Sequence, residues 1–186
     1  MNEPSDAELM ALVQREDRDA FAAIVERHKH ALVGYLSRLT GSRDRAEDLA
    51  QDAFVRLYES RGKYREEGKL APYLFRIATN LARSEARRAR RWRTVGVLLG
   101  IDGRKSALAP EAQLLRSEAH RRVAEAVAEL PTEFRAAVLL KDALDWSYED
   151  IARALDKPEG TIKSRVARGR ERLRRRLAGA EGGADA

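Results

Sequence analysis

Apolar residues recur three or four positions apart along nearly the whole chain, which is the spacing of one face of an α-helix. The clearest stripe lies between residues 19 and 40, and the spacing continues in every later segment except residues 94–110. No segment alternates apolar and polar residues between turn signals, so the pattern predicts no sheet and an all-α fold. The expected helices cover about residues 5–14, 19–40, 42–58, 70–93, 111–130, 132–144, 147–155 and 159–177.

Residues that favour helix ends stand at the borders of these stripes. Ser5 precedes Glu8 at the spacing of a capping box, in which each side chain accepts from the other residue's backbone N–H group. Gly41 follows the second stripe, where a helix commonly ends on a left-handed residue. Further N-terminal caps are expected at Ser42, Thr132 and Ser147.

Residues 94–110 (TVGVLLGIDGRKSALAP) contain three glycines and a proline, which interrupt helices and indicate a flexible linker. The chain is therefore expected to form two small helical domains. Val97, Leu98, Leu99 and Ile101 make the linker partly apolar, so this patch either packs on something or favours aggregation. The expected division is a first domain at residues 1–93, a linker at 94–112, a second domain at 113–177 and a disordered tail at 178–186.

Positive charge gathers in two of the predicted helices. The whole chain has 36 lysines and arginines against 30 aspartates and glutamates. Residues 83–93 hold six arginines and one glutamate, and residues 161–177 hold seven arginines, one lysine and one glutamate. Two such blocks on an otherwise acidic chain favour a polyanionic partner, and nucleic acid is the commonest one. The alternative is that both are ordinary solvated helix faces.

Several classes of protein fit the sequence poorly. The chain has no cysteine and three histidines, and it lacks the HExxH, Walker and GxSxG motifs. His28 lies on an apolar stripe, where a packed histidine is more common than a metal ligand. We therefore expect no enzymatic activity, no catalytic residue, no cofactor, no metal and no small-molecule substrate. The acidic start MNEPSDAELM and the absence of a long apolar run favour a cytoplasmic protein without direct membrane insertion.

Residues 147–173 have the pattern of a DNA-binding helix-turn-helix. A short helix from Ser147 is followed by a turn at residues 156–158 and a second, basic helix. In this motif the N-terminal part of the second helix enters the major groove, where arginine binds guanine and shorter polar side chains bind base edges or phosphates. The arginines from Arg170 to Arg176 are expected on backbone phosphates. The residues expected to contact DNA at the groove are Thr161, Lys163, Ser164, Arg165 and Arg168.

Three segments in order together resemble the extracytoplasmic-function (group 4) sigma factors of bacterial RNA polymerase. EDLAQDAFVRLYES resembles their polymerase-binding helix, and YLFRIATNLARSEARRARR resembles the following segment that melts the promoter. LPTEFRAAVLLKDALDWSYEDIARALDKPEGTIKSRVARGRERL resembles their C-terminal helix-turn-helix domain. The resemblance implies an alternative sigma factor with two domains, sigma region 2 and sigma region 4. It also implies three partners, namely core RNA polymerase, promoter DNA and an anti-sigma factor.

The resemblance also implies roles for residues of the first domain. Asp48, Gln51, Asp52 and Phe54 match the motif that docks on the polymerase, although Phe54 is also expected in the core. The loop at residues 61–69 matches the loop that captures a flipped base of the melted minus-ten strand. The C-terminal domain would recognise the minus-thirty-five element as duplex. The residues that would bind the strand are Tyr64, by stacking, with Asn80, Arg83, Arg87 and Arg88.

Two aspartates depart from the family pattern at turns. Asp145 and Asp156 stand where the family commonly has glycine, before and after the first helix of the motif. Aspartate tolerates a left-handed backbone better than most residues, so we expect the turn of the motif at Asp156 to be kept at modest cost.

Other classes of protein remain as alternatives from the residues alone. A DNA-binding regulator would use the acidic face around Asp48 and Asp52 for dimerisation or for a ligand. A membrane-surface protein would use the basic C-terminal helix. Binding of core RNA polymerase separates these classes from a sigma factor.

Overall fold

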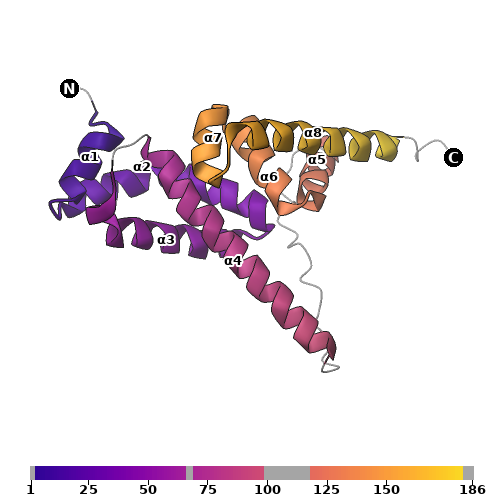
Figure 1. The fold of residues 1–186 in the computed structure, drawn as a ribbon, viewed down its shortest axis with the longest axis horizontal. Coiled ribbons are helices and arrows are strands. Elements are labelled where there is room, and N and C mark those ends of the chain that lie inside the picture. Colours follow the sequence, from indigo (N-terminus) through magenta and orange to yellow (C-terminus); the bar gives the residue numbers. More distant parts are fainter. Residues whose placement is uncertain (1–2, 66–68, 99–117, 182–186) are drawn as a thin grey trace.

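The computed structural model describes residues 3–65, 69–98 and 118–181, and this part of the chain is helical without a strand. Figure 1 shows α1 to α4 as an N-terminal module and α5 to α8 as a C-terminal module that lies against it. The helices are α1 (Asp6–Val13), α2 (Arg18–Thr40), α3 (Arg43–Glu59), η1 (Arg61–Lys63), α4 (Leu70–Leu98), α5 (Glu118–Glu129), α6 (Thr132–Val138), η3 (Leu139–Ala143), α7 (Tyr148–Leu155) and α8 (Glu159–Glu181). The expected all-α class is confirmed. None of the described helices is long and apolar enough to cross a membrane.

Helix ends in the N-terminal module follow the predicted caps. Ser5 forms the complete capping box with Glu8, and Ser42 caps α3 by accepting from the Arg45 N–H at 3.4 Å. Gly41 ends α2 in the left-handed region, with φ of 75°. The sequence analysis missed Asp17, whose carboxylate accepts from two backbone N–H groups at the start of α2. These local interactions define the limits of α1, α2 and α3.

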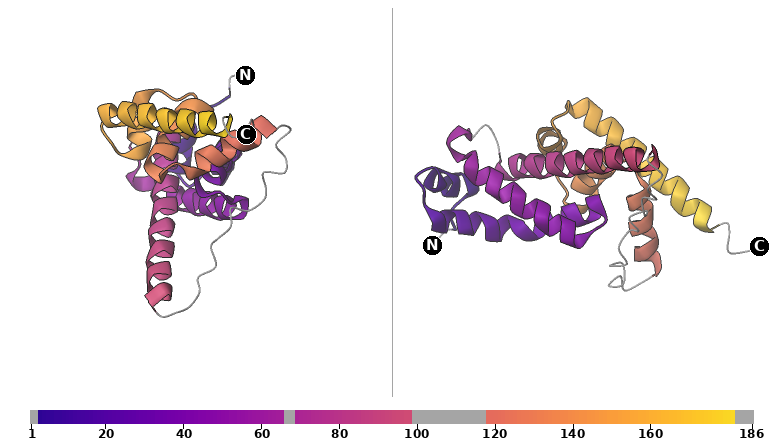
Figure 2. Two further views of the ribbon diagram at one scale, coloured as in Figure 1. Left: turned by 90° about the vertical axis from the view of Figure 1, so that its right-hand side faces the viewer. Right: turned by 90° about the horizontal axis from the view of Figure 1, so that it is seen from below.

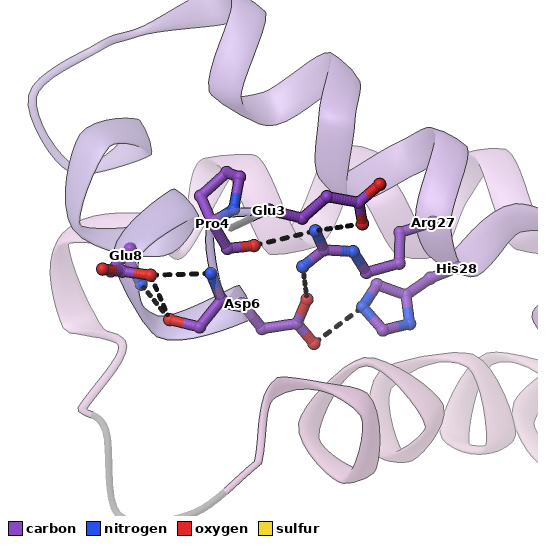
Figure 3. Close-up of polar contacts among 7 residues, drawn as sticks. Glu3, Pro4, Asp6, Glu8, Arg27 and His28 are labelled. Carbon is purple, nitrogen blue, oxygen red and sulfur yellow. Dashed lines mark hydrogen bonds and ion pairs between the residues drawn. The ribbon is translucent and has the colours of Figure 1, made fainter. Parts of the chain in front are cut away.

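Most of the apolar stripe of α2 is buried against α1, α3 and α4, and one polar cluster closes its edge. Asp6 of α1 lies 2.8 Å from His28 Nε2 and accepts from Arg27 Nη1 at 2.7 Å (Figure 3). Arg27 also donates to the Pro4 carbonyl oxygen. His28, only 12% exposed, thus joins α1 to α2, as its place on the stripe suggested.

In the C-terminal module, fewer helix ends follow the predicted caps than in the N-terminal module. Ser147 caps α7 by accepting from the Asp150 N–H at 3.0 Å, as expected. The expected cap at Thr132 is wrong, because Pro131 holds the N-cap position and makes no side-chain cap. A π-helical stretch, η3, follows α6, and single turns of this kind often occur at functional sites. Asp156 adopts φ of 52°, which confirms the expected left-handed turn, and Asp145 is left-handed as well, with φ of 50°.

Two helices extend beyond their predicted limits. α4 continues to Leu98, past the expected domain end at residue 93, and its C-terminal half projects away from both modules in Figures 1 and 2. α8 continues to Glu181, past the expected end at residue 177. Gly96 does not break α4, because a single helical glycine costs only about 1 kcal/mol. Residues 99–112 of the expected linker, residues 113–117 and residues 182–186 lie outside the described residues.

The two modules share one hydrophobic core. Phe75 of α4 lies between Tyr35 of α2, at 5.2 Å between ring centroids, and Trp146, at 4.8 Å. Lys69, at the start of α4, pairs with Asp150 of α7 at 2.8 Å. Arg135 of α6 donates to the Leu39 carbonyl oxygen at 2.7 Å. The predicted division into two domains gave no indication of these contacts.

Candidate nucleic-acid interface

The motif formed by α7 and α8 has the geometry that a helix-turn-helix requires. Asp156 turns the chain in the left-handed region, and the Lys157 N–H donates to the Ala152 carbonyl oxygen at 3.1 Å. A fully buried set of apolar side chains fixes the angle between the two helices. Its members are Ile151, Leu155, Ile162 and Val166.

A glycine lets α8 approach α6 closely. A Cβ atom on Gly169 would lie 2.5 Å from Val138 Cγ2, which is closer than packed atoms come. Gly169 is on the apolar stripe predicted for this helix, but the stripe did not reveal that a glycine is required there. The close approach fixes α8 against the module and determines which of its faces points outward.

The N-terminal half of α8 presents three of the five predicted groove residues to solvent, namely Lys163, Ser164 and Arg168. Lys163 pairs with Glu159 at 2.7 Å, and this hydrogen bond raises the pKa of Lys163, so the ammonium stays charged. Ser164 donates to the Thr161 carbonyl oxygen at 2.8 Å and keeps its lone pairs for a further partner. This face can therefore offer charge and hydrogen bonds to a groove.

The other two predicted groove residues, Thr161 and Arg165, are half-buried. Arg165 Nη1 is buried and has no hydrogen-bond partner among the described residues. The pKa of Arg83 on α4 is lowered by burial and further by repulsion from Arg165. The side chain of Arg165 is therefore near enough to Arg83 for the two like charges to repel each other.

Two arginines in the second half of α8 form ion pairs with acidic residues of the same module. Arg176 pairs with Glu129 of α5 through two hydrogen bonds at 2.6 and 3.0 Å. Arg170 pairs with Asp142, its Nε lying 3.1 Å from Oδ2. Exposed pairs of this kind are weak and exchange readily, so the phosphate contacts expected for these arginines stay a prediction.

α4 carries the second predicted DNA surface. Asn80, Arg87 and Arg88 are exposed, and Arg87 donates to Ser84 Oγ at 2.9 Å. Tyr64 is only 6% exposed and packs edge-on against Tyr73, with centroids 5.3 Å apart. This burial corrects the expectation that the Tyr64 ring is available for stacking.

A cationic cavity of about 510 Å³ opens beside these tyrosines, where the start of α4 meets the C-terminal module. Tyr64 and Tyr73 form part of its wall, and the Arg76 guanidinium lies 5.0 Å from the centre of the Tyr73 ring. The C-terminal module contributes Arg153 and Asp156. Aromatic walls with several cations suit a nucleotide. The other cations of the wall are Lys63, Arg65 and Lys69.

The predicted polymerase-binding residues divide into two groups. Asp48, Gln51 and Asp52 are exposed on one face of α3, whereas Phe54 is 7% exposed and belongs to the core. Sequence analysis missed Val55, which is 49% exposed on the same face. The spacing could have indicated this position, because Val55 follows Asp48, Gln51 and Asp52 by seven, four and three residues, which places it on the same face of the helix. Val55 therefore adds an apolar side chain to this polar face, which a protein partner could bury.

Comparisons with known proteins match each of the two modules to a separate family model. The family model for sigma-70 region 2 matches residues 24–92, and the model for sigma-70 region 4 matches residues 120–173. The chain is 32% identical to the RNA polymerase sigma-H factor of Pseudomonas aeruginosa, over 95% of this chain and 96% of that protein. It is also 32% identical to the ECF RNA polymerase sigma factor SigW of Bacillus subtilis, over 89% of this chain and 92% of that protein.

Two solved structures share the fold. The sigma factor RpoE of Bartonella quintana, in complex with the anti-sigma factor NepR, matches with a TM-score of 0.69 and 30% identity, over 89% of this chain and 98% of that one. CnrH, in complex with the cytosolic domain of CnrY, matches with a TM-score of 0.69 and 24% identity, over 98% of this chain and 100% of CnrH.

Proposed function

Because the chain belongs to the extracytoplasmic-function sigma factors, we propose that its two modules recognise one promoter in two physical forms. The chain binds core RNA polymerase and directs promoter-specific transcription initiation. The C-terminal module binds the minus-thirty-five element as duplex, and the N-terminal module holds the melted minus-ten strand. The observation that carries the proposal is the exposed face of α8, held outward by the packing of α7 and α6.

Duplex recognition falls to the N-terminal half of α8. Lys163, Ser164 and Arg168 are exposed on a helix that fits the width of the major groove. Thr161 and Arg165 continue this face at its edge and complete the predicted set. Lys163 exchanges Glu159 for a phosphate or a base edge when DNA arrives, because an exposed pair costs little to break.

Strand capture falls to α4 and the cavity beside its start. Asn80 supplies an amide that can bind the edge of an unpaired base, and Arg87 and Arg88 supply charge for phosphates. The cavity with Tyr73 and Arg76 can take a base that leaves the duplex. Flipping costs a few kcal/mol per base, and these contacts must offset that cost.

Polymerase binding falls to the outer face of α3. Asp48, Gln51 and Asp52 surround the exposed side chain of Val55. Polar groups around an apolar centre form the usual layout of a specific protein interface. This face lies on the far side of α3 from its buried stripe, so polymerase can bind there without unfolding the module.

The chain itself makes and breaks no bond in this function, and it acts in the cytoplasm beside the polymerase. We assign it an anti-sigma partner, because both solved structures described above are complexes with a second protein, named an anti-sigma factor in one of them. Such a partner would compete for the same DNA and polymerase surfaces.

The proposal is tested by run-off transcription from a genomic library with purified core RNA polymerase, with and without the chain. We expect discrete starts that depend on the chain and share an upstream element. The starts should weaken steeply as salt rises, because phosphate contacts release counterions. A chain that confers no site-selected starts on bacterial core polymerase would refute the proposal.

A further inference from the structure

A single glutamine joins the end of α1 to the loop that precedes α4. Gln14, the C-cap residue of α1, donates through Nε2 to the carbonyl oxygen of Arg61 at 3.0 Å and to that of Tyr64 at 3.1 Å. A side-chain amide has two N–H donors, so Gln14 can use one for each carbonyl. Arg61 begins η1 and Tyr64 follows its last residue, so the two bonds attach both ends of this short turn to α1.

An ion pair beside the glutamine adds a second attachment. Arg61 Nη2 donates to Glu16 Oε1 at 2.9 Å, and the Arg61 guanidinium lies 4.3 Å from the centre of the Tyr58 ring. Glu16 has φ of 69°, in the left-handed region that is uncommon for residues other than glycine. Such a conformation persists where the surrounding contacts impose it. The turn after α1 thus brings both Gln14 and Glu16 to the loop.

Apolar packing between α1 and this loop is incomplete. A cavity of about 220 Å³ lies between them, and Tyr64 and Arg65 form its loop side. The other described residues of its wall come from α1 and its cap, namely Ala7, Met10, Ala11 and Gln14. Surfaces that are separated in this way make few van der Waals contacts with each other. The hydrogen bonds from Gln14 therefore provide much of the attachment.

The same loop residues form part of the cationic cavity. Lys63, Tyr64 and Arg65 line the cavity of about 510 Å³ at the start of α4. Tyr73 packs against the Tyr64 ring, whereas Gln14 holds the Tyr64 backbone. Gln14 is not among the described residues that line this larger cavity. An effect of Gln14 on the cavity must therefore pass through the loop.

We propose that Gln14 is a positioning residue for capture of the melted minus-ten strand. Its two hydrogen bonds hold residues 61–65 in place, so that Lys63, Tyr64 and Arg65 form the wall against which an unpaired base is held. This inference rests on the proposed function, because it requires the cationic cavity to receive a base. Gln14 precedes residue 24, where the match to sigma-70 region 2 begins, so the role falls to a residue outside that match.

A loop that is held before the strand arrives favours binding of a base. Ordering a flexible segment costs conformational entropy, and this cost is subtracted from the affinity. Hydrogen bonds that form before binding remove the cost. The phosphate contacts proposed for Arg87 and Arg88 come from α4 and do not require the loop. Loss of the Gln14 bonds should therefore weaken binding that depends on bases and spare binding that depends on phosphates alone.

The test measures strand binding by the full-length chain assembled with core RNA polymerase. Two fluorescent strands of about 12 nucleotides are compared, one of thymidines and one of abasic sugars with the same number of phosphates. Gln14→Met keeps the length of the side chain and removes both donors. It should raise the Kd of the thymidine strand about fivefold and leave the Kd of the abasic strand unchanged. Arg15→Met, at the exposed neighbour, is the matched control and should not alter the ratio of the two Kd values.

A second measurement requires neither DNA nor polymerase. Trypsin cleaves after lysine and arginine, and the loop offers Arg61, Lys63 and Arg65 as sites. Limited cleavage follows the population of chains in which the loop is open, and the Gln14 bonds keep this population small. In the free chain, Gln14→Met should speed cleavage at these sites about fivefold, as followed by mass spectrometry. The thermal unfolding midpoint and cleavage at sites outside the loop should stay close to wild type.

The outcomes separate this inference from the proposed function. In Gln14→Met, unchanged affinity for the thymidine strand, an equal loss for both strands, or unchanged loop cleavage would overturn the inference and leave the proposed function intact. A wild-type chain that starts no transcription, but prefers the thymidine strand until Gln14 is changed, would overturn the proposed function and keep the inference. Equal binding of both strands by wild type would refute base capture in the cavity, and the role of Gln14 with it.

Discussion

The proposed duplex-binding face of α8 and the proposed strand-binding face of α4 both carry arginines, but their side chains differ in exposure. Lys163, Ser164 and Arg168 are exposed to solvent, whereas Phe75 is buried by Trp146 and Arg83 is half-buried. Charged side chains are well solvated, so α8 can stay exposed at little cost. An exposed aromatic ring costs about 25 cal/mol per Å² of apolar surface, so covering α4 stabilises the free chain.

This difference follows from the chemistry of the two faces. The exposed side chains of α8 can meet duplex DNA without any rearrangement of the described helices. The aromatic ring of Phe75 belongs to the shared core, so the proposed strand contacts of α4 depend on its exposed polar residues, Asn80, Arg87 and Arg88. The predictions below test whether each surface depends on the chemistry assigned to it.

The largest effect is expected from reversing charge on α8. Lys163→Glu with Arg165→Glu should lower promoter-specific transcription more than a hundredfold, because two groove contacts become repulsive toward DNA. Binding to core polymerase, measured by fluorescence titration, should be unchanged. Arg121→Glu with Arg122→Glu is the matched control on the exposed part of α5. Normal starts from the α8 variant would remove this helix from the account.

A somewhat smaller effect is expected on the outer face of α3. Asp48→Arg with Asp52→Arg should weaken core polymerase binding about thirtyfold, because it removes two polar contacts and reverses their charge. Val55→Ala alone should weaken it about threefold, through lost apolar contact. Unpaired-strand binding by the free chain should not change in either variant. Unaltered polymerase affinity in both would show that the polymerase binds elsewhere.

The close packing of α8 on α6 is tested by adding a side chain at Gly169. Gly169→Ala should lower the free energy of unfolding by about 1–3 kcal/mol, because the new Cβ would meet Val138 Cγ2 at 2.5 Å. Gly160→Ala, on the same helix with nothing within 4 Å, is the control and should not destabilise. Thermal unfolding measures both. Equal stability of the two variants would mean that α8 does not depend on the close approach.

The smallest effect is expected at the turn of the motif. Asp156→Gly should raise the free energy of unfolding or leave it unchanged, within about 1 kcal/mol, because glycine adopts φ of 52° without strain. Asp156→Ala should lower it by a similar amount. Chemical denaturation compares the two, and a stability order with alanine above glycine would contradict the left-handed turn.

Local chemistry made much of the fold predictable. Ser5, Gly41 and Ser147 mark helix ends because their effect depends on the backbone within three residues. Asp156 was expected in a left-handed turn from its place in the motif. The stripe of α2 was predictable because helical spacing reports which side of a helix is apolar.

Contacts between distant segments could not be predicted in the same way. Phe75 was recognisable only as an apolar residue, since spacing does not say that Trp146 covers it. Tyr64 was taken for a stacking residue, but its ring fills the space beside Tyr73. Helical spacing also gave no sign that Glu129, 47 residues earlier, pairs with Arg176. In each case the partner is set by the packing of whole helices.

Site-directed crosslinking in the promoter complex tests the central claim most directly. Because the chain has no cysteine, a photo-crosslinker can be attached to Ser164→Cys on α8 or to Asn80→Cys on α4. The account predicts that Ser164→Cys crosslinks duplex near minus thirty-five, and that Asn80→Cys crosslinks the minus-ten strand only once it is melted. Crosslinks from both positions to the same element, or from Asn80→Cys to unmelted duplex, would contradict it.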